Sequence, residues 1–216
     1  MASRAHEGTT PADQQGRMRR NARGAGRTAA RGARLKTRWR PRQLDNCCVR
    51  LTELAEAQRA AQRNGRVCAV AALIRDSGGR VLVQRRGPGR SLLPNCWDIV
   101  GGHVDVGEDL LTALRREVEE ETGWRVRDVP ELMHVEDWEW QNPDGVERVR
   151  EFDFYVEVEG DLEHPRLEVP KHTEFRWVAL GETALLDENR GLDGGYIRRI
   201  VEKALAGGNL SEHPVA

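Results

Sequence analysis

The sequence predicts an α/β fold in which a mixed β-sheet lies between helices. Short apolar or alternating runs, typical of strands, are separated by amphipathic helical patterns. These helical patterns come before, between and after the strands. The chain has 216 residues, enough for one substantial core, because domains commonly contain about 100–150 residues. Helices packed on a sheet bury the apolar faces of both, so an α/β sandwich is expected.

Residues 1–46 are predicted to form a basic disordered arm. They carry twelve Lys and Arg against three acids, and large apolar side chains are almost absent. Burial therefore cannot offset the entropy lost on ordering. The favoured interpretation is a dispensable extension or a start codon placed too far upstream. Contact with nucleic acid through the clustered arginines, or a role as an organelle transit peptide, is less favoured.

A helix is expected over residues 47–65, because apolar residues from Val49 to Ala61 follow helical spacing and Gly65 can end it. Residues 66–207 are expected to form the main domain, and residues 208–216 a C-terminal tail. Strands are predicted at 67–74 and 80–85, joined by a turn as a hairpin, and then at 96–100. The remaining expected elements are strands at 126–137, 148–159 and 175–180 and an amphipathic helix at 196–205.

An acidic helix is predicted over residues 109–122, with Gly123 as its C-terminal stop. Glu117, Glu120 and Glu121 share one face, where each like-charge pair costs about 0.2–0.5 kcal/mol. The C-terminal turn of a helix also prefers cations to acids. The crowding predicts a bound cation, and an oxygen-only ligand set favours Mg²⁺ or Mn²⁺ over zinc. A solvated acidic helix is less favoured, since such faces usually alternate in charge.

The window 102–124 resembles the Nudix box of the Nudix hydrolase superfamily. The fixed positions of that pattern are occupied here by Gly102, Glu108, Arg116, Glu117, Glu120, Glu121 and Gly123. Trp124 fills the last apolar position, where a smaller aliphatic residue is usual. The resemblance covers about residues 67–205, and it implies the α/β/α sandwich with a mixed sheet that the family shares.

The resemblance also implies an activity: Mg²⁺-dependent hydrolysis of a phosphoanhydride bond in a nucleotide or a nucleoside-diphosphate-linked substrate. It implies metal binding by Glu117, Glu120, Glu121 and the carbonyl of Gly101, with Mn²⁺ as an alternative ion. The implied catalytic residues are Glu117, which acts as the base in some members, Glu120 and Arg116. A catalytically silent nucleotide-binding regulator remains the alternative function. An isopentenyl diphosphate isomerase is disfavoured, because its additional His and Cys positions are not found.

Residues outside the Nudix box give alternatives for the remaining site residues and do not identify the substrate. Many relatives have another carboxylate where this chain has Lys171 and His172, and the nearby candidates for that role are Glu168 and Glu174. Three residues are candidates for substrate binding, with solvated charges or sheet packing as the alternatives for them. They are Arg85 and Arg86 for phosphates and Trp138 for stacking on a base. The substrate itself is not identified by the sequence.

The chain is expected to be cytoplasmic and to have no membrane partner. No apolar run approaches the roughly 18 residues of a membrane span, and the arginine-rich start lacks the apolar core of a secretory signal. The four cysteines have no metal-ligand spacing and are expected to be reduced. The oligomeric state stays open, with a homodimer as one option.

Overall fold

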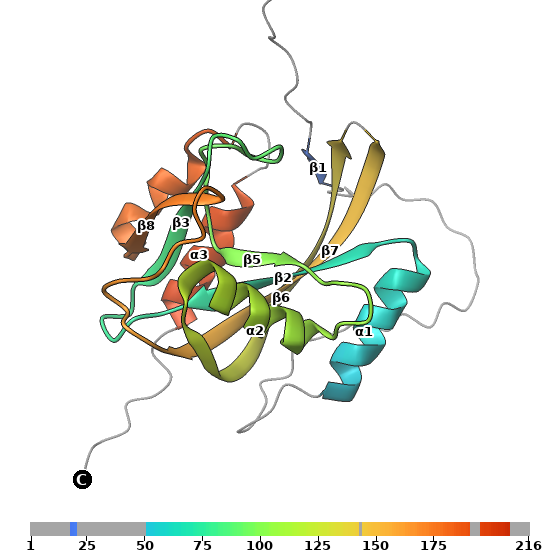
Figure 1. Ribbon diagram of the computed structural model, residues 1–216, viewed down its shortest axis with the longest axis horizontal. Coiled ribbons are helices and arrows are strands. Elements are labelled where there is room, and N and C mark those ends of the chain that lie inside the picture. The colour runs from blue at the N-terminus through green and yellow to red at the C-terminus, as the bar shows by residue number, and fades with distance from the viewer. Residues whose placement is uncertain (1–17, 21–50, 143, 191–194, 208–216) are drawn as a thin grey trace, which may run out of the picture.

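The computed structural model describes residues 18–20, 51–142, 144–190 and 195–207 (Figure 1). Its helices and strands follow the chain in this order: β1 (Met18–Arg20), α1 (Leu51–Arg63), β2 (Val67–Ile74), β3 (Val81–Arg86), β4 (Trp97–Asp98), β5 (Val100–His103), α2 (Leu110–Thr122), β6 (Arg125–Asn142), β7 (Gly145–Glu159), β8 (His172–Val178), the 3-10 helix η1 (Leu180–Asp187) and α3 (Tyr196–Ala206). None of the helices within these ranges is long and apolar enough to cross a membrane.

The strands form two sheets. The larger sheet has the order β1-β6-β7-β2-β5, and the smaller has the order β4-β3-β8. Strands β2 and β7 run parallel, whereas β2 and β5, and β6 and β7, run antiparallel. The larger sheet is therefore mixed, as predicted.

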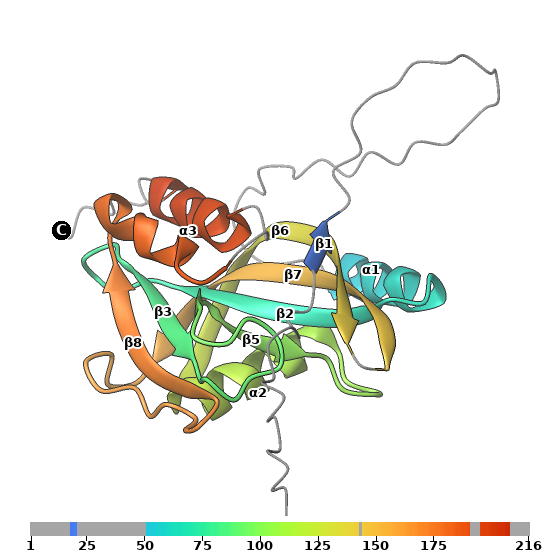
Figure 2. The ribbon, with the colours of Figure 1, turned by 90° about the horizontal axis from the view of Figure 1, so that it is seen from above.

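Strand β2 separates two apolar cores. Its Cys68, Val70 and Ala72 pack with α1 and α2 on one face. Its Ala71 and Leu73 pack on the other face with α3 and with part of β3. Figure 2 shows α2 and α3 on opposite sides of the strands. The predicted α/β/α arrangement is confirmed.

The predicted hairpin of β2 and β3 is wrong. The two strands lie in different sheets and share only one isolated bridge between them, Arg75 with Val81. Both edges of β2 are already paired, one with β5 and the other with β7. Strand β3 therefore pairs with β4 and β8 instead, and the turn between β2 and β3 carries the chain from one sheet to the other.

The boundaries of several other elements also differ from those predicted. Strands β6 and β7 extend to Asn142 and from Gly145, farther toward their turn than predicted, and η1 was not expected. Helix α1 begins at Leu51, while residues 47–50 lie outside the described residues, as do 208–216. Within the arm, residues 18–20 form β1, whose backbone pairs with residues 138–140 of β6. The rest of the arm lies outside the described residues.

Helix α2 has a defined start and end. The Asp109 side chain accepts hydrogen bonds from the backbone N–H groups of Leu111 and Thr112, at 2.9 and 3.0 Å. At the other end, Gly123 takes the left-handed conformation, with φ 73°, and its N–H donates to the Glu119 carbonyl. These caps fix where α2 begins and ends.

The unusual Trp124 has a packing explanation. Its ring stacks on Trp177 of β8, with centroids 6.0 Å apart, and its indole N–H donates to the Asp161 carbonyl at 3.0 Å. A Cβ at Gly160 would lie 2.2 Å from the Trp124 ring, so glycine is required there. The large aromatic thus ties the connection between β7 and β8 to the end of α2.

Candidate active site

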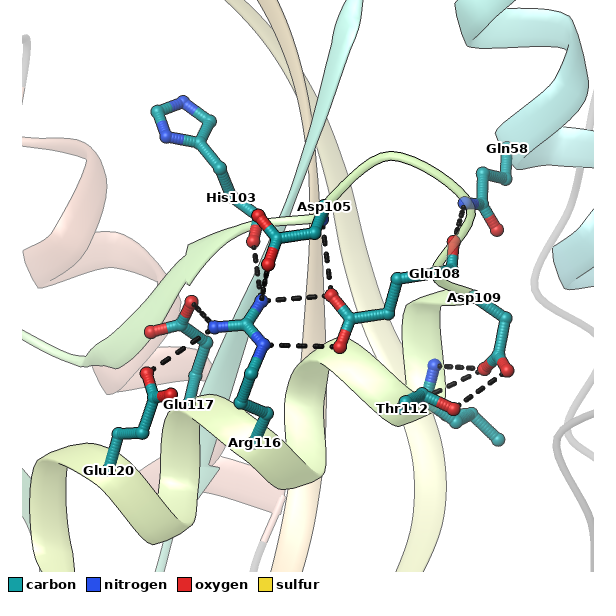
Figure 3. A network of polar contacts seen from close by, with 10 residues as sticks. Gln58, His103, Asp105, Glu108, Asp109, Thr112, Arg116, Glu117 and Glu120 are labelled. Atoms are coloured by element: carbon teal, nitrogen blue, oxygen red, sulfur yellow. Dashed lines mark hydrogen bonds and ion pairs between the residues drawn. The ribbon is translucent and has the colours of Figure 1, made fainter.

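The guanidinium of Arg116 is the centre of the polar network at the acidic helix (Figure 3). Its Nε and Nη2 donate to the two carboxylate oxygens of Glu108, at 3.1 and 2.9 Å. This paired, charge-assisted geometry is the strong form of an Arg–carboxylate contact. The hydrogen bonds from Arg116 lower the pKa of Glu108, and those carboxylate contacts raise the already high pKa of Arg116. Both groups are therefore charged.

The same guanidinium reaches two of the helix carboxylates. Its Nη1 lies 2.6 Å from Glu117 Oε1 and 3.4 Å from Glu120 Oε2. Its Nη2 also donates to the His103 carbonyl at 3.0 Å, which joins α2 to the end of β5. One arginine thus holds the loop before α2 and two acids of its face in a fixed relation.

Glu117 is a buried carboxylate, with only 6% of its surface exposed. Burial raises its pKa, and the hydrogen bond from Arg116 opposes that rise. Its carboxyl group lies against the backbone of Gly102, where a Cβ would be only 2.5 Å from the carboxyl carbon. Any side chain at position 102 would therefore have to displace the Glu117 carboxyl group from its present position.

Glu121 is held deeper in the same region. Its Oε2 accepts hydrogen bonds from the Gly101 backbone N–H, at 3.0 Å, and from Nε2 of Gln84. Burial and, to a lesser extent, the nearby charge of Glu117 together raise the pKa of Glu121 to about 8. Its Oε1 lies 3.6 Å from Nδ1 of His172, whose pKa is lowered to about 4 by burial and by the charge of Arg86. The imidazole is therefore neutral at neutral pH.

The donor chemistry of this face fits a hard divalent cation. Among the described residues no three His, Cys, Asp or Glu side chains already converge as a metal site. Glu117 and Glu120 nevertheless both contact the same Arg116 nitrogen, and the charge of Glu117 raises the pKa of Glu121. Glu117, Glu120 and Glu121 offer oxygen ligands only, as Mg²⁺ prefers, and a cation near them would offset their mutual repulsion.

The two arginines predicted to bind phosphate are already engaged. Arg85 contacts Glu174 at 3.5 Å, and its guanidinium lies 5.8 Å from the centre of the Trp97 ring. Arg86 donates to the Leu92 carbonyl at 3.0 Å and to Asp98 at 3.3 Å. The register of β3 and β8 shifts between the two arginines. The charge of Arg86 helps to lower the pKa of His172 beside Glu121.

Trp138 is packed against neighbouring strands of the larger sheet. It is 6% exposed and clusters with Ala69 and Val149 of the neighbouring strands. Its indole N–H donates to Glu151 Oε2 at 2.6 Å. Since almost none of its ring is accessible, this placement speaks against stacking of Trp138 on a substrate base.

The two candidates for a distal acid differ in position. Glu168 pairs with Lys171 at 2.8 Å, and the pKa of Lys171 is raised by Glu168 and, more weakly, by Glu117 and Glu121. Glu174 instead pairs with Arg85 and Arg176. The Glu168–Lys171 pair therefore lies on the side of the acidic helix. The Lys171 carbonyl also accepts a hydrogen bond from the Gly87 N–H at 2.7 Å, which holds this segment against the end of β3.

Three residues at the site were not predicted as parts of it: Gln84, His172 and Lys171. Their positions come from β3 and from the segment that enters β8, which are far from α2 in the sequence. One signal was present, because Gln84 directly follows the aliphatic run Val81-Leu82-Val83. A polar residue that continues a buried run is a candidate for an internal contact.

Residues 65–200 match the NUDIX domain family. The chain belongs to the Nudix family. Curated relatives include an m7GpppN-mRNA hydrolase, NUDT17, from Xenopus laevis, 45% identical over 60 residues, which are 28% of this chain and 20% of the relative. An RNA pyrophosphohydrolase from Caulobacter vibrioides is 34% identical over 125 residues, with 49% of this chain and 67% of the relative covered.

A Nudix hydrolase from Deinococcus radiodurans is 47% identical over 62 residues, which are 28% of this chain and 36% of the relative. The matched segments thus span a fifth and about a third of the lengths of the Xenopus and Deinococcus proteins. Among solved structures, a MutT protein from Methanosarcina mazei is 27% identical, with a TM-score of 0.52 and coverage of 64% of this Nudix chain and 92% of the other.

Proposed function

We propose that this Nudix protein is a Mg²⁺-dependent hydrolase that cleaves a phosphoanhydride bond in a nucleotide or nucleoside-diphosphate-linked substrate. The observation that carries the proposal is the arrangement of carboxylates on α2: Arg116 contacts Glu117 and Glu120, and Glu121 is fixed by the Gly101 N–H. Mg²⁺ bound at these oxygens would neutralise charge that develops on phosphate oxygens during hydrolysis.

The residues of the chain supply the remaining chemistry. Glu117 is a suitable base for the attacking water, because burial raises its pKa toward the pH range in which a base works well. Arg116 keeps its carboxylate in place through the 2.6 Å contact. Glu120, whose side chain is 46% exposed, faces the solvent side from which a substrate would enter. Preorganisation of these groups reduces the rearrangement needed in the transition state.

Cationic side chains near the acids would bind the phosphates of the substrate. Lys171 is the best placed of them, since its pKa is raised by Glu168, Glu117 and Glu121 and it therefore stays protonated. Arg86 contributes positive charge beside His172. Glu168, held by Lys171, is the favoured distal carboxylate. Arg85 and Trp138 are less favoured for substrate binding, because Arg85 pairs with Glu174 and the Trp138 indole donates to Glu151.

The substrate class favoured by the relatives is a nucleotide-type diphosphate, including the 5′ end of an RNA. Two of the similar proteins are named as an mRNA hydrolase acting on m7GpppN ends and as an RNA pyrophosphohydrolase. Both names describe phosphoanhydride bonds next to a nucleoside. An RNA end is therefore tested beside small nucleotides in the assay below.

The test is release of phosphate or diphosphate from a panel of nucleoside di- and triphosphates, sugar nucleotides, NADH, capped RNA and 5′-triphosphate RNA. Turnover should require Mg²⁺ or Mn²⁺. Ca²⁺ tolerates irregular coordination, so it should support binding without aligning the attacking water. Binding of these substrates without turnover in any of the ions would favour the catalytically silent regulator instead.

A further inference from the structure

The side chain of Gln84 is buried where an apolar residue would be expected. It follows Val81, Leu82 and Val83 on β3, and all four residues are at most 1% exposed. An amide in such surroundings loses its hydrogen bonds to water and must recover them within the protein. Packing alone would favour another aliphatic side chain at this position, so the contacts of the amide explain its presence.

Only half of the Gln84 amide is satisfied. Nε2 donates to Glu121 Oε2, whereas Oε1 is buried and has no hydrogen-bond partner among the described residues. When Glu121 is ionised, as it is when it binds a cation, the opposite orientation of the amide would place its oxygen against the carboxylate and would be repulsive. The amide is therefore oriented by Glu121, and the unpartnered Oε1 follows from that orientation.

The contact controls which oxygen of Glu121 is available. Oε2 receives two donors, Gln84 Nε2 from β3 and the Gly101 N–H from β5. Oε1 receives no hydrogen bond among the described residues and lies 3.6 Å from Nδ1 of His172 in β8. The Glu121 carboxylate of α2 thus lies between strands of both sheets. Its Oε2 is fixed by two hydrogen bonds, whereas its Oε1 accepts none among the described residues.

We infer that Gln84 is a positioning residue for Glu121: it fixes the carboxylate through Oε2, so that Oε1 is the oxygen offered to the divalent cation. This inference rests on the proposed metal-binding role of the α2 carboxylates. Residues that hydrogen-bond to metal ligands commonly change metal affinity by about 10–100-fold when they are replaced. Gln84 acts through Glu121 and needs no contact with the substrate.

The test is a double-mutant cycle on the full chain, with Mn²⁺ binding measured by calorimetry in the absence of substrate. Gln84→Met keeps the length and shape of the side chain and removes the donor. It should raise the Mn²⁺ dissociation constant about tenfold, while the same change in a Glu121→Gln background should alter it less than about twofold. Thr183→Val, which removes another buried hydrogen bond far from α2, should leave Mn²⁺ binding unchanged.

Thermal unfolding in EDTA shows whether each variant is folded. If Gln84→Met does not fold, Gln84→Asn serves instead, because its shorter amide cannot reach Glu121. Unchanged Mn²⁺ affinity in a folded Gln84 variant, or an equal loss in both backgrounds, would overturn the inference. These outcomes are separate from failure of the proposed function, which would appear as wild-type protein that binds Mn²⁺ and hydrolyses nothing in the substrate panel.

Discussion

At the level of single residues, the α2 acids divide into buried and exposed members. Glu117 and Glu121 are 6% and 4% exposed, whereas the Glu120 side chain is 46% exposed. The two buried carboxylates accept hydrogen bonds from Arg116, Gly101 and Gln84, which offset the cost of burying them. Substitution of the exposed member should therefore affect turnover far more than stability.

Glu120→Gln should leave the fold intact and lower turnover at least about a hundredfold, because it removes one charge from the proposed metal site. Without metal the variant should be slightly more stable, since one repulsive carboxylate is gone. Initial rates at saturating Mg²⁺ and thermal unfolding in EDTA measure both effects. Glu119→Gln, on the exposed face of the same helix, is the matched control and should behave as wild type. Full activity of the Glu120 variant would refute the site assignment.

The raised pKa of Glu121 predicts a dependence of stability on pH. A carboxyl whose pKa rises from 4.5 to about 8 on folding destabilises the native state progressively as pH increases between those values. Below pH 4.5 the acid is protonated in both states, and the penalty is absent. In EDTA, the melting temperature of wild type should therefore fall more steeply from pH 5 to pH 8 than that of Glu121→Gln. Parallel slopes would show that the carboxyl titrates normally.

At the level of elements, the close approach of β5 to α2 is what places the acids. A Cβ at Gly102 would lie 2.5 and 2.6 Å from the two carboxylate oxygens of Glu117. Gly102→Ala should therefore displace Glu117, reduce turnover at least about tenfold and destabilise the fold by about 1–3 kcal/mol. Gly181→Ala, in η1, meets nothing within 4 Å and is the matched control. The measurements are the initial rates and the chemical denaturation curves of both variants. Equal turnover and equal stability of the Gly102 and Gly181 variants would contradict the steric argument.

The same level shows what the sequence could and could not predict. The acidic helix and its C-terminal stop at Gly123 were predicted, because the helical pattern and the glycine cap are local in sequence; Asp109, expected within the helix, is its N-cap. The hairpin of β2 and β3 was not, because strand pairing depends on which edges other strands occupy. Gln84 and His172 were missed for a related reason: each contacts Glu121 across more than thirty residues of sequence. Local pattern can mark Gln84 as a candidate for an internal contact, but it does not say which distant residue the side chain meets.

At the level of the whole molecule, the two sheets and α2 form one structural unit around the acids. Glu121 is contacted from β3, β5 and β8, and the stack of Trp124 on Trp177 joins α2 to β8. Folding of these elements together is therefore a condition for assembling the site. The residues of α2, β3, β5 and β8 that meet at Glu121 all lie beyond residue 50, so the site is expected to form without the basic arm.

Deletion of residues 1–46 should therefore leave hydrolysis of a small nucleotide within about threefold of wild type.

The deletion does remove β1, whose backbone pairs with residues 138–140 at the outer edge of β6. An uncovered strand edge can pair with another chain, so the truncated protein should self-associate more at high concentration, as size-exclusion chromatography would show. Binding of a polyanion such as RNA should weaken, because the arm carries a net charge of +9. Loss of the folded circular dichroism spectrum on deletion would show instead that the arm supports the fold.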